Sequence, residues 1–214
     1  MRPGSWNWGS PAIPEGSGEP HDLFPDGLIH DSTEVVARRL LGCRIRSSVH
    51  GPRVEGVIVE TEAYVGPHDP ASHAAARVGR TRRNESMFGT AGSAYVYRSY
   101  GIHWCLNVVT GPEGFPAAVL VRALEPLDGE GAMEERRGGN RPLCSGPGRL
   151  CQALGVTGAL DGHDLRYAPL QLLEGWTVPE ERVGRSGRVG IRHAADWPLR
   201  FYLKGHPGVS GRPR

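Results

Sequence analysis

The sequence predicts an α+β fold, a single mixed domain in which a curved antiparallel β-sheet is flanked by peripheral helices. Three observations lead to this class. Short apolar runs bounded by Gly and Pro, which are typical of strands, recur through the chain. The candidate helices between them are few and short, and no internal repeat is visible. The length of 214 residues suits one domain with a sizeable core.

Both ends of the chain are predicted to lie outside this domain. Residues 1–20 are rich in Pro, Gly and Ser, a composition typical of disordered segments. Residues 206–214 also have the composition of a tail. The folded domain is therefore expected to span residues 21–205.

The first part of the domain is predicted to contain a helix, two strands and a long loop. Residues 31–34 form a helix-capping sequence, and Gly42 stops the helix after about three turns. Strands are expected at 43–49 and 53–64, followed by a loop at 65–93 with a short helix near 71–76. Long loops within a compact domain are usually functional or disordered.

The second part is predicted to consist mainly of strands. The apolar runs place strands at 94–98, 103–110, 117–124 and 198–204. Residues 99–102, between the first two, are short enough to form a β-hairpin. A short helix is expected at 129–137. Pro147 near its start and Gly155 just past its end favour another helix from Ser145 to Leu154.

Positive charge is concentrated in the long loop and the strand that follows it. The formal net charge is only +2, so the protein as a whole does not require a polyanionic partner. Between Ala74 and Trp104, however, five arginines stand against the single acid Glu85. This local excess suits phosphate binding, and it equally suits a solvated loop. The five are Arg77, Arg80, Arg82, Arg83 and Arg98.

Several classes of function find no motif in this sequence. The four cysteines form no C-x-x-C pair and are expected to be reduced residues of the core. The histidines are scattered singly, without the zinc-deaminase pattern or H-E-x-x-H, so no metal and no cofactor is expected. No apolar signal core and no stretch of membrane-spanning length occurs, which predicts a soluble cytoplasmic protein without a membrane partner.

The strand predicted at 53–64 carries two carboxylates and a tyrosine on one face. Residues two apart on a strand share a face, so Glu60, Glu62 and Tyr64 point the same way. A carboxylate held rigidly beside an aromatic ring suits proton transfer at a flat substrate. Taken alone, the segment is explained more simply by a solvated strand face.

Aromatic residues gather around the predicted hairpin. Tyr95 and Tyr97 share a face of its first strand, and Tyr100 lies at its tip. An aromatic residue at an exposed tip beside a basic loop suits a wedge that enters the minor groove and unstacks bases. His73 lies in the long loop between these residues and the carboxylates. A wedge, an aromatic pocket, a carboxylate and the nearby arginines together describe an enzyme that flips a base out of duplex DNA.

The chain resembles a known family, the alkyladenine (3-methyladenine, methylpurine) DNA glycosylases of the mammalian type, which also occur in bacteria. The matching segments follow the family's order and span about residues 36–205. They are ARRLLGCRI, VIVETEAYVGPHDPASHA, RTRRNESMFGTAGSAYVYRSYGIHWCLNVV, VLVRALEPL, LCSGPGRLCQALGV and RVGIRHA with PLRFYLKG. The resemblance implies a protruding hairpin that intercalates into DNA.

The resemblance also implies a catalytic set. Glu62 matches the family's general base, and Arg122 matches an arginine that helps to hold the nucleophilic water. Val189 matches a residue whose carbonyl also holds that water. Glu60 lies on the same predicted face as Glu62 but keeps a structural role, which makes it the natural control for a substitution of Glu62.

A second set is implied at the substrate and the DNA. Tyr64, His73 and Tyr97 would stack on the base, Asn107 would discriminate among purines, and Tyr100 would enter the minor groove. For Asn107 a backbone-bonded strand amide is the alternative, and for His73 a structural histidine. Further DNA contacts are expected from Ile102, His103, Arg82, Arg83, Arg98 and Arg149.

The expected activity is removal of 3-methyladenine, 7-methylguanine, hypoxanthine and ethenoadenine from double-stranded DNA by a monomer associated with the nucleoid. Lys204 is the only lysine and lies outside every matching pocket motif, which predicts a monofunctional enzyme rather than one that forms a Schiff base. A non-catalytic binder of damaged duplexes and a nucleosidase acting on free nucleosides are the rival interpretations. RHAAD at 192–196 departs from the Gly-rich run, similar to GHAGE, that the family leads us to expect.

Overall fold

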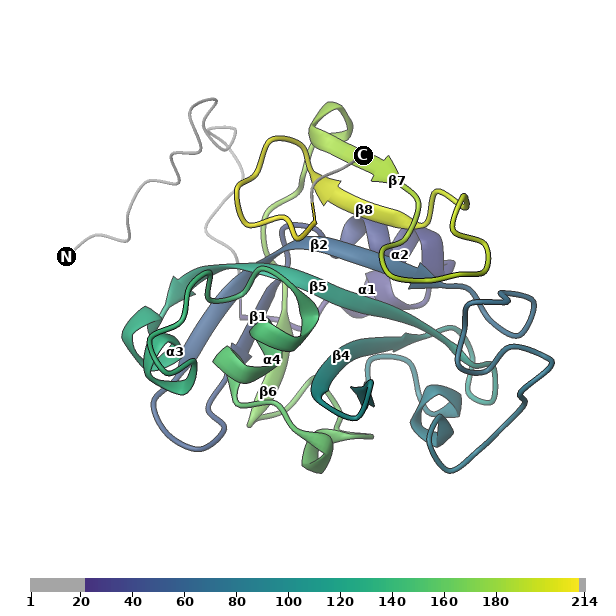
Figure 1. The fold of residues 1–214 in the computed structure, drawn as a ribbon, viewed down its shortest axis with the longest axis horizontal. Helices are drawn as coiled ribbons and strands as arrows, with labels where there is room; N and C mark the ends of the chain where they lie inside the picture. The colour runs from purple at the N-terminus through teal and green to yellow at the C-terminus, as the bar shows by residue number, and fades with distance from the viewer. Residues whose placement is uncertain (1–21, 212–214) are drawn as a thin grey trace.

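The structure, a computed structural model, describes residues 22–211. The disordered segment predicted for residues 1–20 lies outside the described residues. Within them the chain forms a single eight-stranded antiparallel sheet that curls into a half-barrel, with a few short helices around it (Figure 1). The predicted α+β class is therefore confirmed.

The long strands β2 (Val54–Tyr64) and β5 (Ala117–Asp128) form the centre of the sheet. The strand order is β3-β4-β5-β2-β1-β6, and β8 pairs with both β2 and β7. The other strands are β1 (Arg44–Ser47), β3 (Ala94–Ser99), β4 (His103–Thr110), β6 (Leu170–Leu173), β7 (Val183–Ser186) and β8 (Arg200–Leu203). The helices are α1 (Asp26–Ile29), α2 (Thr33–Arg39), α3 (Glu130–Arg136) and α4 (Pro147–Leu154), with 3-10 turns at Glu85–Phe88, Gly158–Leu160 and Glu180–Arg182.

The core lies between the sheet and the helices α2 and α4. In Figure 1, α2 lies behind the sheet, whereas α3 and α4 lie in front of it. Val36 and Ala37 of α2 and Leu150 of α4 are all fully buried in one apolar cluster with residues from the sheet. The Thr61 hydroxyl of β2 also donates to the Ala37 carbonyl oxygen at 2.7 Å, which ties α2 to the central strand.

β2 is irregular at the point where it carries its carboxylates. Its register against β5 shifts on both sides of Glu60, and β8 joins its other edge at residues 60–62. Such irregularities redirect side chains on a strand. They place Glu60 and Glu62 inside the protein rather than on a solvated surface.

Some predicted elements differ from the observed ones. Residues 71–76 form turns instead of a helix, and the nearby helical turn lies at Glu85–Phe88. β6 and β7 were not predicted, because hydrophobic periodicity is low along the part of the sequence that contains them.

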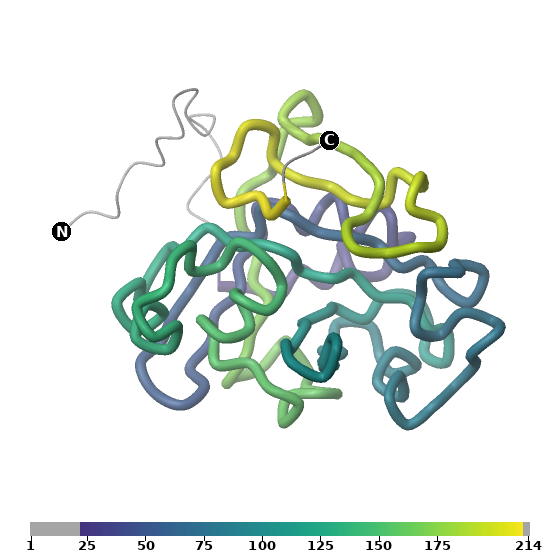
Figure 2. Tube along the Cα trace, viewed as in Figure 1, coloured from purple at the N-terminus to yellow at the C-terminus, as the bar shows by residue number. Residues whose placement is uncertain are grey.

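Residues 206–211 do not form a tail. His206 and Ser210 are buried, and the Ser210 N–H donates to Glu60 Oε2 at 2.6 Å. In Figure 2 this yellow segment turns back towards the sheet. The prediction of a tail from residue 206 is therefore wrong for residues 206–211, whose polar groups satisfy buried charges.

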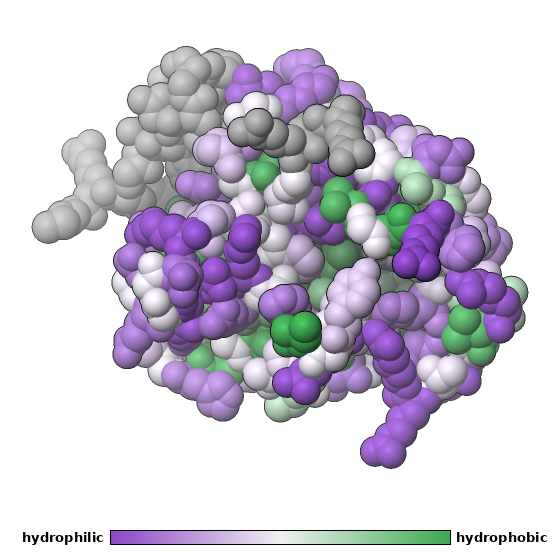
Figure 3. All heavy atoms as spheres, in the orientation of Figure 1, coloured by the Kyte–Doolittle hydropathy of each residue, from purple (hydrophilic) through white to green (hydrophobic). Residues whose placement is uncertain are grey.

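Within residues 22–211, no helix is long and apolar enough to cross a lipid bilayer. The face drawn in Figure 3 is mostly hydrophilic, and its hydrophobic patches are small and separate.

Candidate active site

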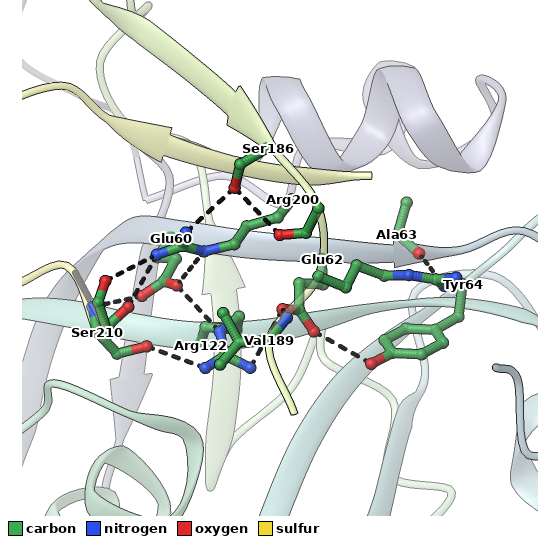
Figure 4. Close-up of polar contacts among 12 residues, drawn as sticks. Glu60, Glu62, Ala63, Tyr64, Arg122, Ser186, Val189, Arg200 and Ser210 are labelled. Carbon is green, nitrogen blue, oxygen red and sulfur yellow. Dashed lines mark hydrogen bonds and ion pairs between the residues drawn. The ribbon is translucent and has the colours of Figure 1, made fainter. Parts of the chain in front are cut away.

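Glu62 lies at the centre of the candidate site and is completely buried. Its Oε1 accepts a hydrogen bond from the Val189 N–H at 2.7 Å and lies 3.2 Å from Arg122 Nη1. Its Oε2 accepts from the Tyr64 hydroxyl at 3.1 Å, as Figure 4 shows. Burial raises the pKa of Glu62 above its usual value, although Arg122, the Val189 amide and Tyr64 oppose the shift. The solvated-face alternative for this strand is wrong.

Glu60, two residues earlier, is also completely buried but has different partners. Its Oε1 accepts from Arg122 Nε at 3.0 Å and from Arg200 Nε at 2.7 Å, and its Oε2 accepts from the Ser210 amide. Arg122 therefore links the two carboxylates (Figure 4). Two acids and two arginines balance each other in charge, which is how the interior tolerates them.

A cavity of about 550 Å³ opens in front of Glu62. Glu62 itself is not on its wall, but all three of its partners, Tyr64, Arg122 and Val189, are. The carboxylate thus lies directly behind the cavity lining. The other aromatic or imidazole side chains on the wall are His73, Tyr95, Tyr97 and Tyr100.

Three rings form a packed cluster on this wall. Tyr95 and Tyr97 stack with centroids 5.3 Å apart, and the His73 ring meets Tyr97 edge-on at 4.4 Å. His73 Nδ1 also shares a hydrogen bond of 2.8 Å with the Tyr95 hydroxyl. Burial, assisted by nearby Arg83, lowers the pKa of His73 to about 4, so its ring is neutral at neutral pH. Tyr95 was not among the predicted site residues, although its shared face with Tyr97 is visible in the sequence.

Asn107 lies on the cavity wall and is almost completely buried. Its Nδ2 donates to the Tyr95 carbonyl oxygen across the β3–β4 pair at 2.9 Å. The backbone-bonded amide suggested as an alternative is therefore present. Because the same side chain faces the cavity, this bond also fixes the orientation in which the amide meets a ligand.

A buried ion pair that the sequence did not reveal supports the site from behind. Arg188 binds both carboxylate oxygens of Asp69, at 2.5 and 2.8 Å, and donates to the Ala63 carbonyl oxygen at 3.0 Å. Its guanidinium lies 4.7 Å from the centre of the Tyr64 ring. Since Val189 follows directly in the chain, this pair holds Tyr64 and the Val189 amide in place together. Asp69 and Arg188 are 119 positions apart, so no local pattern signals their contact.

The turn between β3 and β4 is exposed. Tyr100 is 86% exposed and has a left-handed φ of 50°, and Ile102 is 67% exposed. His103 is exposed as well. Tyr100 also reaches the rim of the cavity. Insertion of this turn into DNA stays a prediction.

The predicted DNA-contacting arginines divide into two groups. Arg83 lines the cavity, and its guanidinium lies 5.6 Å from the centre of the Tyr97 ring. Arg82, Arg98 and Arg149 are exposed but do not line it. The Arg98 guanidinium lies 5.0 Å from the Trp104 ring, and Arg149 donates to the Ser145 carbonyl oxygen at 2.9 Å.

Within residues 22–211 no group of three or more His, Cys, Asp or Glu side chains could hold a metal ion. The four cysteines are free and buried, and burial raises the pKa of the Cys43 and Cys144 thiols to about 12. They are therefore thiols of the core at neutral pH.

Comparison with known proteins shows the family of this chain. The profile of a family described as "Methylpurine-DNA glycosylase (MPG)" matches residues 28–207. Proteins named "Putative 3-methyladenine DNA glycosylase" are 52% identical in Methanoculleus marisnigri, over 88% of this chain and 99% of the relative, and 50% identical in Agrobacterium fabrum, over 82% and 86%. A relative of the same name in Rhodopseudomonas palustris is 51% identical over 81% of each chain. The chain therefore belongs to the methylpurine-DNA glycosylase family, and it is a DNA glycosylase, a hydrolase of DNA repair.

Proposed function

We propose that this glycosylase is monofunctional, that it flips alkylated or deaminated purines out of duplex DNA, and that it hydrolyses their N-glycosidic bond with water activated by Glu62. The substrates proposed are 3-methyladenine, 7-methylguanine, hypoxanthine and ethenoadenine, and the product is an abasic site. The observation that carries the proposal is the buried Glu62 carboxylate, held by Arg122, Tyr64 and Val189 directly behind an aromatic cavity.

Glu62 suits the two requirements of this hydrolysis, a group that accepts a proton from water and a negative charge that stabilises the sugar cation. The C1′–N9 bond breaks with its electron pair leaving on the purine, and positive charge develops on the sugar. A water molecule adds to C1′ and gives up a proton, which the carboxylate accepts, while its negative charge stabilises the sugar cation. Arg122 and the Val189 segment border both the carboxylate and the cavity, so they are placed to orient that water.

The aromatic cluster suits a damaged base. Alkylation at N3 or N7 makes a purine cationic, and a cation is attracted to each aromatic face by about 0.5–2 kcal/mol. Tyr64 and Tyr97 on the cavity wall supply such faces, and neutral His73 does not repel the charge. We propose that Asn107, fixed by its bond to the Tyr95 backbone, hinders a purine with a 2-amino group and so disfavours undamaged guanine. 7-Methylguanine also carries that group, but its positive charge adds the attraction to the aromatic faces.

The exposed turn between β3 and β4 is proposed to open the duplex. Tyr100 lies at the mouth of the cavity and is almost fully exposed, which suits a side chain that fills the gap left by a flipped nucleotide. A Tyr100→Ala variant is expected to lose duplex activity. Unchanged release from a duplex would exclude the wedge.

The position of the only lysine supports a monofunctional mechanism. Lys204 does not line the cavity, and its Nζ donates to the Glu181 carbonyl oxygen at 3.0 Å. Water is therefore the proposed nucleophile. Trapping a covalent DNA complex with borohydride through Lys204 or the N-terminal amine would contradict this.

One experiment separates the proposal from its rivals. Release of hypoxanthine or ethenoadenine from an oligonucleotide with a single lesion is measured for the wild type and for Glu62→Gln. Release by the wild type and its loss in the variant support the proposal. Tight binding without release would instead favour a binder of damaged DNA, and release only from free nucleosides would favour a nucleosidase. We further propose that the enzyme acts as a monomer.

A further inference from the structure

A second cavity adjoins the aromatic one. It measures about 330 Å³, and the two cavities share four wall residues: Ala71, His73, Arg83 and Ile191. The second cavity is therefore a side chamber of the candidate active site. Its remaining wall consists of the loop 70–84 on one side and residues 191–193 on the other.

All ionisable side chains on the wall of this side chamber are basic. They are Arg77, Arg83, Arg192, His73 and His193, and no Asp or Glu lines it. The nearby acids are already paired, because Asp69 binds Arg188 and Glu85 binds Arg80. Three guanidinium groups thus face a small chamber without a neutralising carboxylate, which favours an anion there.

The arginines of the chamber retain capacity for a ligand. Arg77 and Arg83 each donate from Nη2 to a main-chain oxygen, that of Pro70 at 3.0 Å and that of Arg98 at 3.1 Å. These bonds position the two guanidiniums and leave their other N–H groups available. Within the described residues, no hydrogen bond or ion pair is formed by the Arg192 side chain.

Arg192 stands where the family resemblance leads us to expect glycine. The same short segment begins with Val189, whose amide holds Glu62, so residues 189–193 line both cavities in succession. This departure adds a cation beside the site without touching the catalytic cluster. The proposed mechanism assigns no role to Arg192, the first residue of RHAAD.

We propose that the side chamber is a phosphate subsite, in which Arg77, Arg83 and Arg192 bind a backbone phosphodiester of the damaged strand next to the flipped nucleotide. The inference rests on the proposed function, since it requires a nucleotide in the aromatic cavity. A phosphate fits better than a second base, because the chamber wall has no Phe, Tyr or Trp, only the imidazoles of His73 and His193, and its charges are all positive. The loop around Val189 then couples the position of the strand to that of Glu62.

The experiment measures the dissociation constant of a single-lesion duplex as a function of salt for three proteins. These are the wild type, Arg192→Ala, and Arg53→Ala as a matched control. Arg53 is an exposed arginine paired with Asp128, and it lines neither cavity. Removal of one arginine–phosphate interaction is expected to reduce the slope of log Kd against log salt by about 0.9. Arg192→Ala should show this reduction, and Arg53→Ala should keep the wild-type slope.

A second arm locates the phosphate. Single linkages around the lesion are replaced one at a time by neutral methylphosphonates. Replacing one of the linkages that adjoin the lesion should weaken binding of the duplex to the wild type but not to Arg192→Ala. Arg192→Lys should restore part of this difference. The subsite is overturned if the slope does not change, or if no linkage couples to Arg192. A competition experiment adds inorganic phosphate at constant ionic strength. The subsite is also overturned if Arg192→Ala changes only the binding of free phosphate and leaves the binding of the duplex unchanged.

The two proposals fail separately. If the wild type releases no damaged base, the proposed function fails whatever the binding data show. If it releases the base but Arg192→Ala binds with wild-type salt dependence, the glycosylase mechanism stands and the phosphate subsite is rejected.

Discussion

Glu60 and Glu62 lie two residues apart on β2 and are equally buried, yet their surroundings differ. Glu60 is enclosed by Arg122, Arg200 and the Ser210 amide, none of which except Arg122 reaches the cavity. Every partner of Glu62 forms part of the cavity wall. Burial and charge are therefore the same for a structural and a candidate catalytic carboxylate, and the partners distinguish them.

The difference also defines the role of Arg122. Glu60 accepts from its Nε at 3.0 Å, and this contact turns Nη1 towards Glu62. Glu60 is thus a positioning residue for Arg122, which makes it unsuitable as the silent control for a Glu62 substitution. Substitution of Glu62 should instead lower mainly the activity, and substitution of Glu60 should lower mainly the stability.

The largest effect is expected from Glu62→Gln. The variant loses the proton acceptor but leaves Arg122 paired with Glu60, so the fold should be retained. Base release under single-turnover conditions should fall by about 10²–10⁴-fold, the usual contribution of a general base. Thermal unfolding measured in parallel should show little change. A variant with a wild-type rate would remove Glu62 from the mechanism.

Glu60→Ala should instead act on stability. It leaves Arg200 and part of Arg122 buried without their carboxylate, and breaking a buried pair in this way costs about 3–5 kcal/mol. Urea denaturation measures the change in the free energy of unfolding. Glu130→Ala is the matched control, since its carboxylate is exposed in a pair with Arg141 and its loss should cost at most about 1 kcal/mol. If Glu60→Ala were as stable as the wild type, Glu60 would not be structural.

Ser210→Ala tests the C-terminal part of the same cluster with a smaller effect. The substitution removes the hydroxyl that accepts from Arg122 Nη2 at 3.1 Å and keeps the amide bond to Glu60. A hydrogen bond to a charged group is worth about 1.5–3 kcal/mol, and the free energy of unfolding should fall by up to that amount. Ser48→Ala, on the exposed surface, should stay within about 0.5 kcal/mol of the wild type. Equal stability of the two variants would show that the hydroxyl is not needed.

Much of the sheet could be predicted from the sequence because its strands are short apolar runs separated by turn residues. The strands expected at 94–98 and 103–110 agree closely with β3 and β4. The strand expected at 117–124 continues to Asp128, since Pro126 at its end, a residue unusual in a strand, still faces Gly56 of β2. Elements whose stability comes mainly from tertiary pairing, such as β6 and β7, were not predictable in this way.

The candidate site shows the same limit. Glu62, Tyr64, Arg122 and Val189 were selected through family motifs, and the structure brings them together around one carboxylate. Their supports were not predictable. The contact of Asp69 with Arg188 and that of Glu60 with Ser210 join residues far apart in the chain, and pairing of this kind leaves no periodic signal.

The smallest effect is expected from pH, through the segment that carries Ser210. His206 accepts a hydrogen bond at Nδ1 from the Gly208 N–H at 3.0 Å, and burial lowers the pKa of its ring from 6.5 to about 4. Between these values the unfolded chain binds a proton that the folded protein does not, so stability falls as the pH decreases from about 6.5 to about 4. The lowered pKa of His73 adds to the loss in the same range.

A His206→Gln variant should therefore lose less stability than the wild type over this acid range, because one of the two contributions is gone. Urea denaturation at a series of pH values measures the slope, with His68→Gln on the exposed surface as the control. If protonation of His206 destabilises the C-terminal segment, Ser210→Ala should show the same dependence of the free energy of unfolding on pH as the wild type. The reason is that the hydrogen bond lost in Ser210→Ala does not depend on a proton. A pH slope in His206→Gln equal to that of the wild type would assign the acid sensitivity to the site around Glu62 and His73 instead.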